Sequence, residues 1–242
     1  MDGMKIVSPE SMVAAIREAG IIPFFKGPVP GFSVEELTPP EHWFDSSDDL
    51  GPWDWKIAAV QSGDIAYGKF LCGGKAAFAT LEWYAHLRNW RLSLPSCQPD
   101  AAGRKVLALM EKQGSVSSKD IRTLLGVKKT AADAVVTRLS HQTRLLIGDI
   151  QRVYRGPTLS YSGWQTCSFC APEALFGAED AGPVFGGFSP FSAGDPLDTG
   201  CSPAESYEAL LGHLREVLAG VSPGTGAGSG AVDEKALKKL LD

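Results

Sequence analysis

The fold of this chain is decided by a stretch that begins Arg104-Lys-Val-Leu-Ala-Leu-Met-Glu-Lys112 and continues Ser117-Ser-Lys-Asp-Ile-Arg-Thr-Leu-Leu-Gly126. Apolar residues of the first segment recur at helical spacing and stop at Gly114, which predicts a helix that ends there. Ser117 and Asp120 form a start that resembles a capping box, and Gly126 suits the left-handed turn that closes a helix. We therefore expect two consecutive helices, the second of them short.

A third helix and a β-hairpin are predicted to follow. The helix is expected to be capped by Thr130-Ala-Ala-Asp133, because the apolar residues after Thr130 repeat at helical spacing as far as Leu139. Two strands are expected over 144–153 and 164–170, joined by the polar tip Arg155-Gly-Pro-Thr158. Helix, tight turn, helix and hairpin in this order predict a winged helix-turn-helix, which presents a helix to a DNA groove.

The same region is basic within an acidic chain. Residues 101–155 contain 11 Lys and Arg against 4 Asp and Glu, a balance of +7, whereas the whole chain has a net charge of −5. A basic island of this kind is expected of a surface that binds phosphate. The alternative is a solvated basic surface on a domain that only packs or dimerises.

The predicted DNA contacts come from the third helix and the hairpin. A recognition helix and its wing would present these side chains to DNA: Lys128, Lys129, Thr130, Thr137, Arg138, His141, Arg152 and Arg155. Asp133 argues against this arrangement, because a carboxylate near the start of the helix would repel phosphate. Phosphate contacts would dominate the affinity, so we expect binding to weaken steeply with salt.

Length and composition are those of an ordinary globular protein. The chain has 242 residues, 44% of them hydrophobic and 21% charged, which suffices for one large domain or two small ones. No apolar run approaches the ~20 residues that cross a bilayer, and the N-terminus lacks the pattern of a signal peptide. We therefore expect a cytoplasmic protein that has no membrane partner.

The cysteines and histidines indicate no metal site. The five cysteines are odd in number and scattered, which is typical of reduced thiols. Cys167 and Cys170 have the spacing of metal ligands, but the chain contains no second such pair. The four histidines lie far apart in the sequence. We therefore predict neither a metal nor a cofactor.

Residues 1–97 are predicted to form a small mixed α/β domain that is rich in aromatic residues. A helix is expected from Ser8 to Gly20, and another over 81–90. Between them we expect three strands over 54–60, 65–71 and 76–79, arranged as an antiparallel β-meander. An aromatic cluster is predicted here from Trp53, Trp55, Tyr67 and Trp83. Such a cluster either builds a core or stacks planar ligands such as bases.

The winged helix-turn-helix domain is expected over residues 98–176, which makes the predicted fold class α+β. Residues 177–242 are expected to contain a loop over 182–200, a packing helix and a flexible C-terminal tail. The packing helix begins at the capping box Ser202-Pro-Ala-Glu205. A last amphipathic segment, 232–241, either docks on its own chain, binds a partner or frays.

A family resemblance rests on five blocks: Ile22-Pro-Phe-Phe25, Gly31-Phe-Ser-Val-Glu-Glu36, Gly51-Pro-Trp-Asp-Trp-Lys56, Asp64-Ile-Ala-Tyr-Gly-Lys-Phe70 and Ala131-Ala-Asp-Ala-Val-Val-Thr-Arg-Leu139. Together they span most of residues 10–175. The chain thereby resembles a group of proteins related to the AlkZ/YcaQ winged-helix DNA glycosylases. The resemblance implies a basic DNA surface built on winged helices, and the excision of alkylated or crosslinked bases.

The chain departs from these glycosylases at their catalytic motif. They carry a short Gln-x-Gln or Gln-x-Asp sequence, whereas this chain has no Gln-x-Gln. Its Gln-x-Asp is Gln98-Pro-Asp100, which lies in the predicted linker with a proline between the two residues. The resemblance therefore supports the fold and nucleic-acid binding more than it supports catalysis.

Base excision would need a carboxylate beside a stacking wall. The candidates are Asp54, which lies between two tryptophans, and Glu82, which precedes Trp83. A carboxylate flanked by aromatic rings can have a raised pKa and act as an acid or a base. The alternative is that Asp54 caps a turn, while Lys56 and Lys69 are exposed strand residues.

Three functions are therefore open: a protein that binds double-stranded DNA, a glycosylase-like enzyme that acts on alkylated or crosslinked bases, and a winged helix that serves only protein assembly. No pattern in the sequence indicates an oligomeric state.

Overall fold

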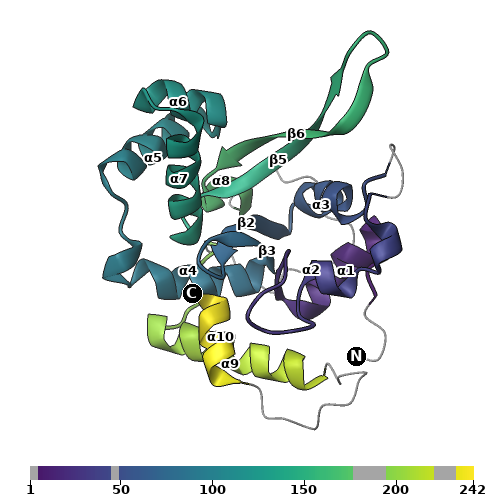
Figure 1. Ribbon diagram of the computed structural model, residues 1–242. Coiled ribbons are helices and arrows are strands. Elements are labelled where there is room, and N and C mark those ends of the chain that lie inside the picture. The colour runs from purple at the N-terminus through teal and green to yellow at the C-terminus, as the bar shows by residue number, and fades with distance from the viewer. Residues whose placement is uncertain (1–4, 45–48, 177–194, 221–232) are drawn as a thin grey trace.

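The computed structural model describes residues 5–44, 49–176, 195–220 and 233–242. They form a mixed α+β structure that contains two three-stranded antiparallel sheets (Figure 1). Most of the loop predicted over 182–200, and most of the flexible tail predicted beyond residue 220, lie outside the described residues.

The first sheet contains the hairpin that the sequence predicts around Gly73 and Gly74. Its strands are β2 (Ile65–Leu71) and β3 (Lys75–Thr80). The third strand is β1 (Ile21–Pro23), which pairs with β3, so the order is β1-β3-β2. This sheet packs against α1 (Pro9–Ala19), whose N-cap is Ser8 and whose C-cap is Gly20, as predicted.

The segment predicted as a strand over 54–60 is instead a helix, α3 (Pro52–Gln61), so the predicted β-meander is wrong. Pro52 suits the first turn of a helix, where its missing N–H is not needed. The helix buries Asp54 and Lys56 together with its apolar residues, so its sequence lacks the polar face that identifies a helix. Neither residue is the turn cap or exposed strand position considered above, although Lys69 is exposed.

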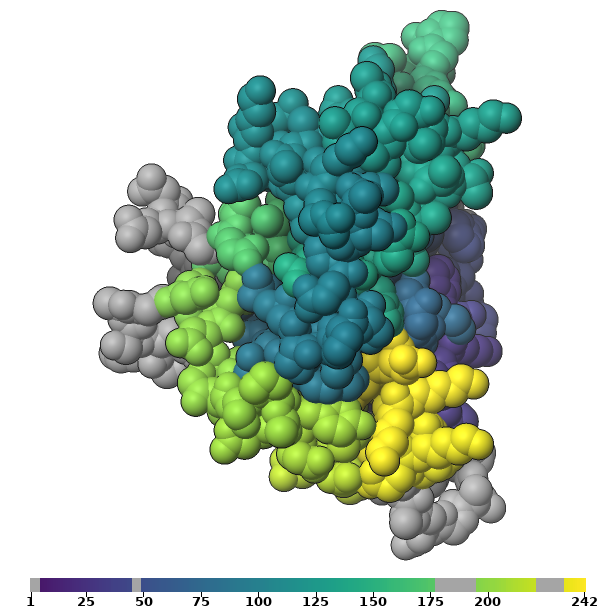
Figure 2. All heavy atoms as spheres, turned by 90° about the vertical axis from the view of Figure 1, so that its left-hand side faces the viewer, coloured from purple at the N-terminus to yellow at the C-terminus, as the bar shows by residue number. Residues whose placement is uncertain are grey.

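The helices that precede and follow the central stretch complete this half of the molecule. They are α2 (Val34–Leu37), the short 3-10 helix η1 (Pro40–His42), α4 (Leu81–Leu92), the 3-10 helix η2 (Pro95–Cys97), α9 (Pro203–Gly220) and α10 (Glu234–Leu241). The capping box predicted before α9 forms between Ser202 and Glu205. Figure 2 shows α10, in yellow, beside α9 and α4. The last segment therefore docks on its own chain, because its three leucines are buried.

The central stretch follows the predicted order of elements. These are α5 (Ala101–Gln113), β4 (Ser115–Ser117), α6 (Ser118–Leu125), α7 (Lys129–His141), β5 (Leu146–Arg155), β6 (Ser160–Cys170) and the short α8 (Pro172–Phe176). The N-cap of α7 is Lys128 rather than Thr130. The short elements β4 and α8 were not predicted, and the second sheet has the order β4-β6-β5.

Buried apolar side chains form two clusters. The larger lies between the first sheet, α1, α4, α9 and α10, and it also takes in Leu146 and Ile150 of β5. The smaller lies within the central stretch, from Val106 of α5 to Phe169 of β6. The base of the β5–β6 hairpin therefore belongs to both cores, while its tip extends beyond the body of the molecule (Figure 1).

Candidate nucleic-acid interface

The first part of α7 is open to solvent. Lys128, Lys129 and Thr130 are all exposed. Lys128 is the N-cap, so its backbone carbonyl accepts from Ala131 and Ala132 while its side chain is left outside the helix. The free N–H groups of a helix start and two ammonium groups together favour an anion. Asp133, one turn further on, is half-buried rather than exposed.

The second part of α7 is engaged by its own chain. Lys69 of β2 donates to the Thr137 hydroxyl at 3.1 Å, and Arg138 forms an ion pair of 2.8 Å with Asp100. The His141 imidazole contacts the backbone oxygen of Asp242 after α10. Burial lowers the pKa of His141, and the nearby Arg91 lowers it further. These three side chains therefore already have protein partners, whereas the side chains of Lys128 and Lys129 extend into solvent.

The β5–β6 hairpin carries exposed aromatic rings that lie beside arginines. The Arg155 guanidinium lies 5.0 Å from the ring centre of Trp164, which is 57% exposed. Nearer the base, the Arg152 guanidinium lies 5.0 Å from the ring of Tyr161. Tyr154 is also largely exposed. The hairpin thus presents cations and planar rings, the two kinds of group that bind phosphates and bases.

Asp54 is the buried centre of the contacts between α3 and the hairpin. Its Oδ1 accepts hydrogen bonds from the Tyr161 hydroxyl and, at 2.8 Å, from Gln165 Nε2. Its Oδ2 lies 3.2 Å from the Arg152 guanidinium and accepts from the backbone N–H of Leu50 at 3.3 Å. All these partners are donors, so both oxygens of the carboxylate have hydrogen-bond partners within the protein. The arrangement suits a residue that fixes the hairpin in place.

Trp53 and Lys56 strengthen the same joint. The Trp53 indole donates to the carbonyl of Gly163 at 3.1 Å, and Gln165 Nε2 donates to the carbonyl of Trp53 at 3.1 Å. The Lys56 ammonium donates to that carbonyl at 2.7 Å. Burial lowers the pKa of Lys56 to about 7, although Cys167 and Asp54 act in the opposite direction. No pattern in the sequence indicated that this lysine is buried.

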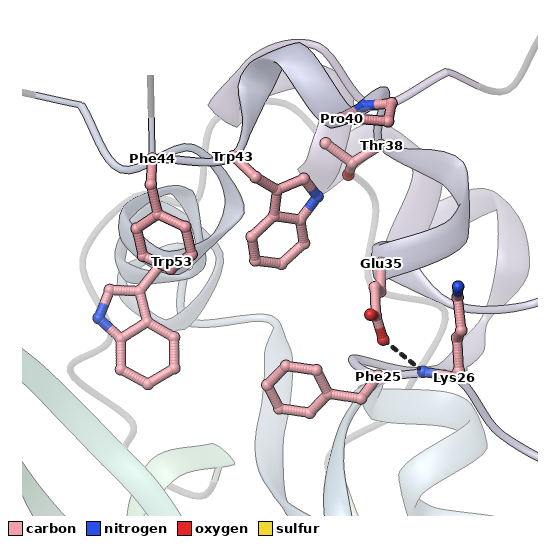
Figure 3. Close-up of a pocket in the computed structure, with 8 residues that line it drawn as sticks. All are labelled: Phe25, Lys26, Glu35, Thr38, Pro40, Trp43, Phe44 and Trp53. Atoms are coloured by element: carbon pink, nitrogen blue, oxygen red, sulfur yellow. Dashed lines mark hydrogen bonds between the residues drawn. The ribbon is translucent and has the colours of Figure 1, made fainter. Parts of the chain in front are cut away.

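An aromatic pocket opens on the side of α3 that carries Trp53. Figure 3 shows the rings of Phe25, Trp43, Phe44 and Trp53 around it, with the Glu35 carboxylate on the opposite side. Lys26, Thr38 and Pro40 complete the lining, and the cavity measures about 590 Å³. The segments that form it lie up to 28 positions apart in the sequence, from Phe25 to Trp53.

Of the predicted aromatic cluster, only Trp53 lines this aromatic pocket. The Trp55 indole is buried and donates to Asp49, Tyr67 stacks on Phe78 in the core, and Trp83 stacks on His213 of α9. The other rings and the carboxylate of the pocket were not among the predicted site residues: Phe25, Trp43, Phe44 and Glu35. The adjacent aromatic residues Trp43 and Phe44, in a stretch that lacks apolar periodicity, were the available signal.

The remaining candidates are not brought together. Glu82 is exposed in the first turn of α4, whereas Asp54 is buried against β6. Cys167 and Cys170 lie on β6, and burial raises the pKa of both thiols, that of Cys170 to about 11. Both thiols therefore stay protonated near neutral pH. Within the described ranges, we find neither a metal-binding group of three or more His, Cys, Asp or Glu side chains nor a helix that could span a membrane.

Comparison with known proteins identifies one family. The model of the family described as AlkZ related matches residues 6–225. The match includes both sheets, the aromatic pocket and the whole of α9. No curated protein and no solved structure matches the chain.

Proposed function

Since the chain belongs to the AlkZ-related family, we propose that it has a role in DNA repair and binds double-stranded DNA. The binding unit is a winged helix-turn-helix, with α6 and α7 as the helix pair and the β5–β6 hairpin as the wing. It corresponds to the domain predicted over residues 98–176. The observation that carries this proposal is the exposure of Lys128 and Lys129 at the start of α7, on a unit that also carries the hairpin.

The interface uses only part of the predicted contact set. Lys128, Lys129 and Thr130 meet phosphates at the open start of α7. The hairpin presents Arg155 and Trp164 to a groove of the DNA. The Arg155 guanidinium and the exposed Trp164 ring suit contacts with the sugar–phosphate backbone. We assign no direct DNA contact to the remaining predicted residues, because protein groups already engage them: Thr137, Arg138, His141 and Arg152.

The test compares two pairs of adjacent lysines. In Lys128→Glu/Lys129→Glu, two cations at the start of α7 are reversed. In the control Lys238→Glu/Lys239→Glu, the charge change is equal, but both lysines are exposed on α10, far from α6 and the hairpin (Figure 1). Duplex binding is measured by fluorescence anisotropy at several salt concentrations.

We expect wild-type binding to weaken with salt, because bound phosphates release counterions. Reversal of Lys128 and Lys129 should lower the affinity and reduce the slope of log K against log salt by about 2. The control should keep the wild-type slope. An absence of duplex binding by the wild type even at low salt would remove the proposal and leave protein assembly as the role of this unit.

A glycosylase-like activity on alkylated or crosslinked bases is the second candidate. One observation favours it: the Asp54 carboxylate and the Gln165 amide are hydrogen bonded beside a cavity of about 600 Å³ that lies between α3 and β5. Abasic sites formed in an alkylated duplex are the readout. We expect Asp54→Asn to abolish them and Glu82→Gln, an exposed control on α4, to retain them. An inactive wild type across a panel of lesions would remove this candidate.

A further inference from the structure

We propose that the aromatic pocket binds a single nucleobase that has left the DNA stack, and that it recognises the exocyclic amino group of that base. The inference rests on the proposed DNA binding and adds a second contact beside the helix and the hairpin. It concerns binding alone and requires no chemical step.

The walls of the aromatic pocket suit a planar ring. Phe25 and Phe44 are 40% and 60% exposed, although large aromatic side chains are usually buried. Trp43 meets the buried Phe24 edge to face at 6.0 Å, which holds its indole in position. Figure 3 shows these two rings, with those of Trp43 and Trp53, arranged around the opening. A volume of about 590 Å³ lies in the range of pockets that hold small molecules.

Glu35 supplies the polar recognition. One of its oxygens, Oε2, accepts from the backbone N–H of Lys26 at 2.9 Å, which fixes the orientation of the carboxylate. The figure shows this carboxylate facing the rings of Phe25 and Trp43. A carboxylate only accepts hydrogen bonds, so it selects a ligand that donates. Adenine donates through its exocyclic amino group, whereas unsubstituted purine, which lacks that group, presents only acceptor nitrogens on the same edge.

The position of the aromatic pocket connects it to DNA on the hairpin. Its wall residue Trp53 donates to the carbonyl of Gly163 on β6, so pocket and hairpin share one side chain. Lys26 is exposed at the rim, where its ammonium can meet the phosphate that follows an extruded base. An apolar peptide would not need the fixed carboxylate, and a free metabolite would not need the contact with the hairpin.

The test uses three duplexes of equal length: one fully paired, one with a single extrahelical adenine and one with a single extrahelical purine that lacks the amino group. Affinities are measured for the wild type, for Phe25→Ala and for Glu35→Gln. Phe44→Ala serves as a second wall variant, since a side chain that is 60% exposed can be truncated without loss of the fold. Trp164→Ala is the control, because it changes the hairpin outside the pocket.

We expect the wild type to bind the adenine bulge about tenfold more tightly than the paired duplex, as stacking on aromatic rings allows. Phe25→Ala and Phe44→Ala should weaken this preference and leave the affinity for paired DNA unchanged. In Glu35→Gln the amide oxygen takes the Lys26 N–H, so its NH₂ meets the base and the preference for adenine over unsubstituted purine is lost. Trp164→Ala should weaken all three complexes alike.

Two results would overturn the inference while DNA binding stands: equal wild-type affinity for all three duplexes, or a preference for the bulge that survives both wall variants. A wild type that binds none of the three at low salt would overturn DNA binding itself, and this inference with it.

Discussion

The carboxylate of Asp54 on α3 lies 3.2 Å from the guanidinium of Arg152 on β5, and the Asp54 side chain is completely buried while Arg152 is 36% exposed. The negative charge of the buried carboxylate is therefore paired with a guanidinium that lies at the protein surface. This ion pair connects the body of the molecule to the hairpin.

Removal of the Asp54 carboxylate should destabilise the protein. In Asp54→Ala the donors of Tyr161, Gln165 and Arg152 lose a shared acceptor, and we expect a loss of about 3 kcal/mol in the free energy of unfolding. The matched control is Asp64→Ala, whose ion pair with Arg17 is partly exposed and should contribute less than about 1 kcal/mol. Urea unfolding measures both. Equal stabilities for the two variants would show that Asp54 does not anchor the hairpin.

Lys56 should make stability depend on pH. Burial lowers its pKa to about 7 in the folded protein, whereas the unfolded chain keeps the ordinary value near 10.5. Between these values the unfolded state binds more protons, so the free energy of unfolding should rise with pH, by up to about 1.4 kcal/mol per pH unit. Lys56→Met lacks this contribution.

The measurement is urea unfolding of the wild type and Lys56→Met at pH 7, 8 and 9. Other titrating groups cancel in the difference between the two proteins. We expect Lys56→Met to have a higher free energy of unfolding than the wild type at pH 7. This difference should disappear as the pH rises. Parallel pH curves would mean that Lys56 stays protonated in the fold.

Helices α5, α6 and α7 could be predicted because each is amphipathic, and α5 and α6 also carry their own stop signals. Gly114 and Gly126 end α5 and α6 as expected, since both adopt the positive φ that glycine tolerates. α3 could not be predicted in this way, because it is buried on most sides and its polar residues Asp54 and Lys56 point into the protein. Periodicity reports a helix only where one face meets water.

The aromatic pocket could not be predicted from local pattern either. Phe25, Trp43 and Trp53 lie in three separate segments, and only the folded chain places their rings around one cavity. The same holds for His141, whose partner Asp242 lies 101 positions further along the chain. Sequence spacing identifies residues on one helix face, but it does not identify contacts made through tertiary packing.

Arg91 should stabilise the junction of α4, α7 and α10. Its buried guanidinium donates to the carbonyl of His141 at 2.6 Å and also to that of Leu241. Arg91→Leu leaves these helix-end carbonyls without a donor, and we expect a loss of about 3 kcal/mol. Arg215→Leu is the control, because its pair with Glu234 also joins α10 to α9 but is exposed. If both variants lose the same small amount in thermal unfolding, Arg91 has no special role.

Gly51 should be the least replaceable glycine beside the aromatic pocket. Its φ of 64° and ψ of −139° form a backbone conformation that residues other than glycine rarely adopt. A Cβ at this position would also lie 1.7 Å from the carbonyl oxygen of His42. The close approach of Gly51 to His42 brings Trp43 near the start of α3, and it thereby sets the width of the pocket. Gly63 also has a positive φ, of 80°, but a Cβ would meet nothing within 4 Å. We expect Gly63→Ala to cost about 1 kcal/mol and Gly51→Ala more than about 3 kcal/mol in urea unfolding. If the two alanines cost the same, the close approach of the two segments is relieved by a small backbone shift, and Gly51 does not set the pocket.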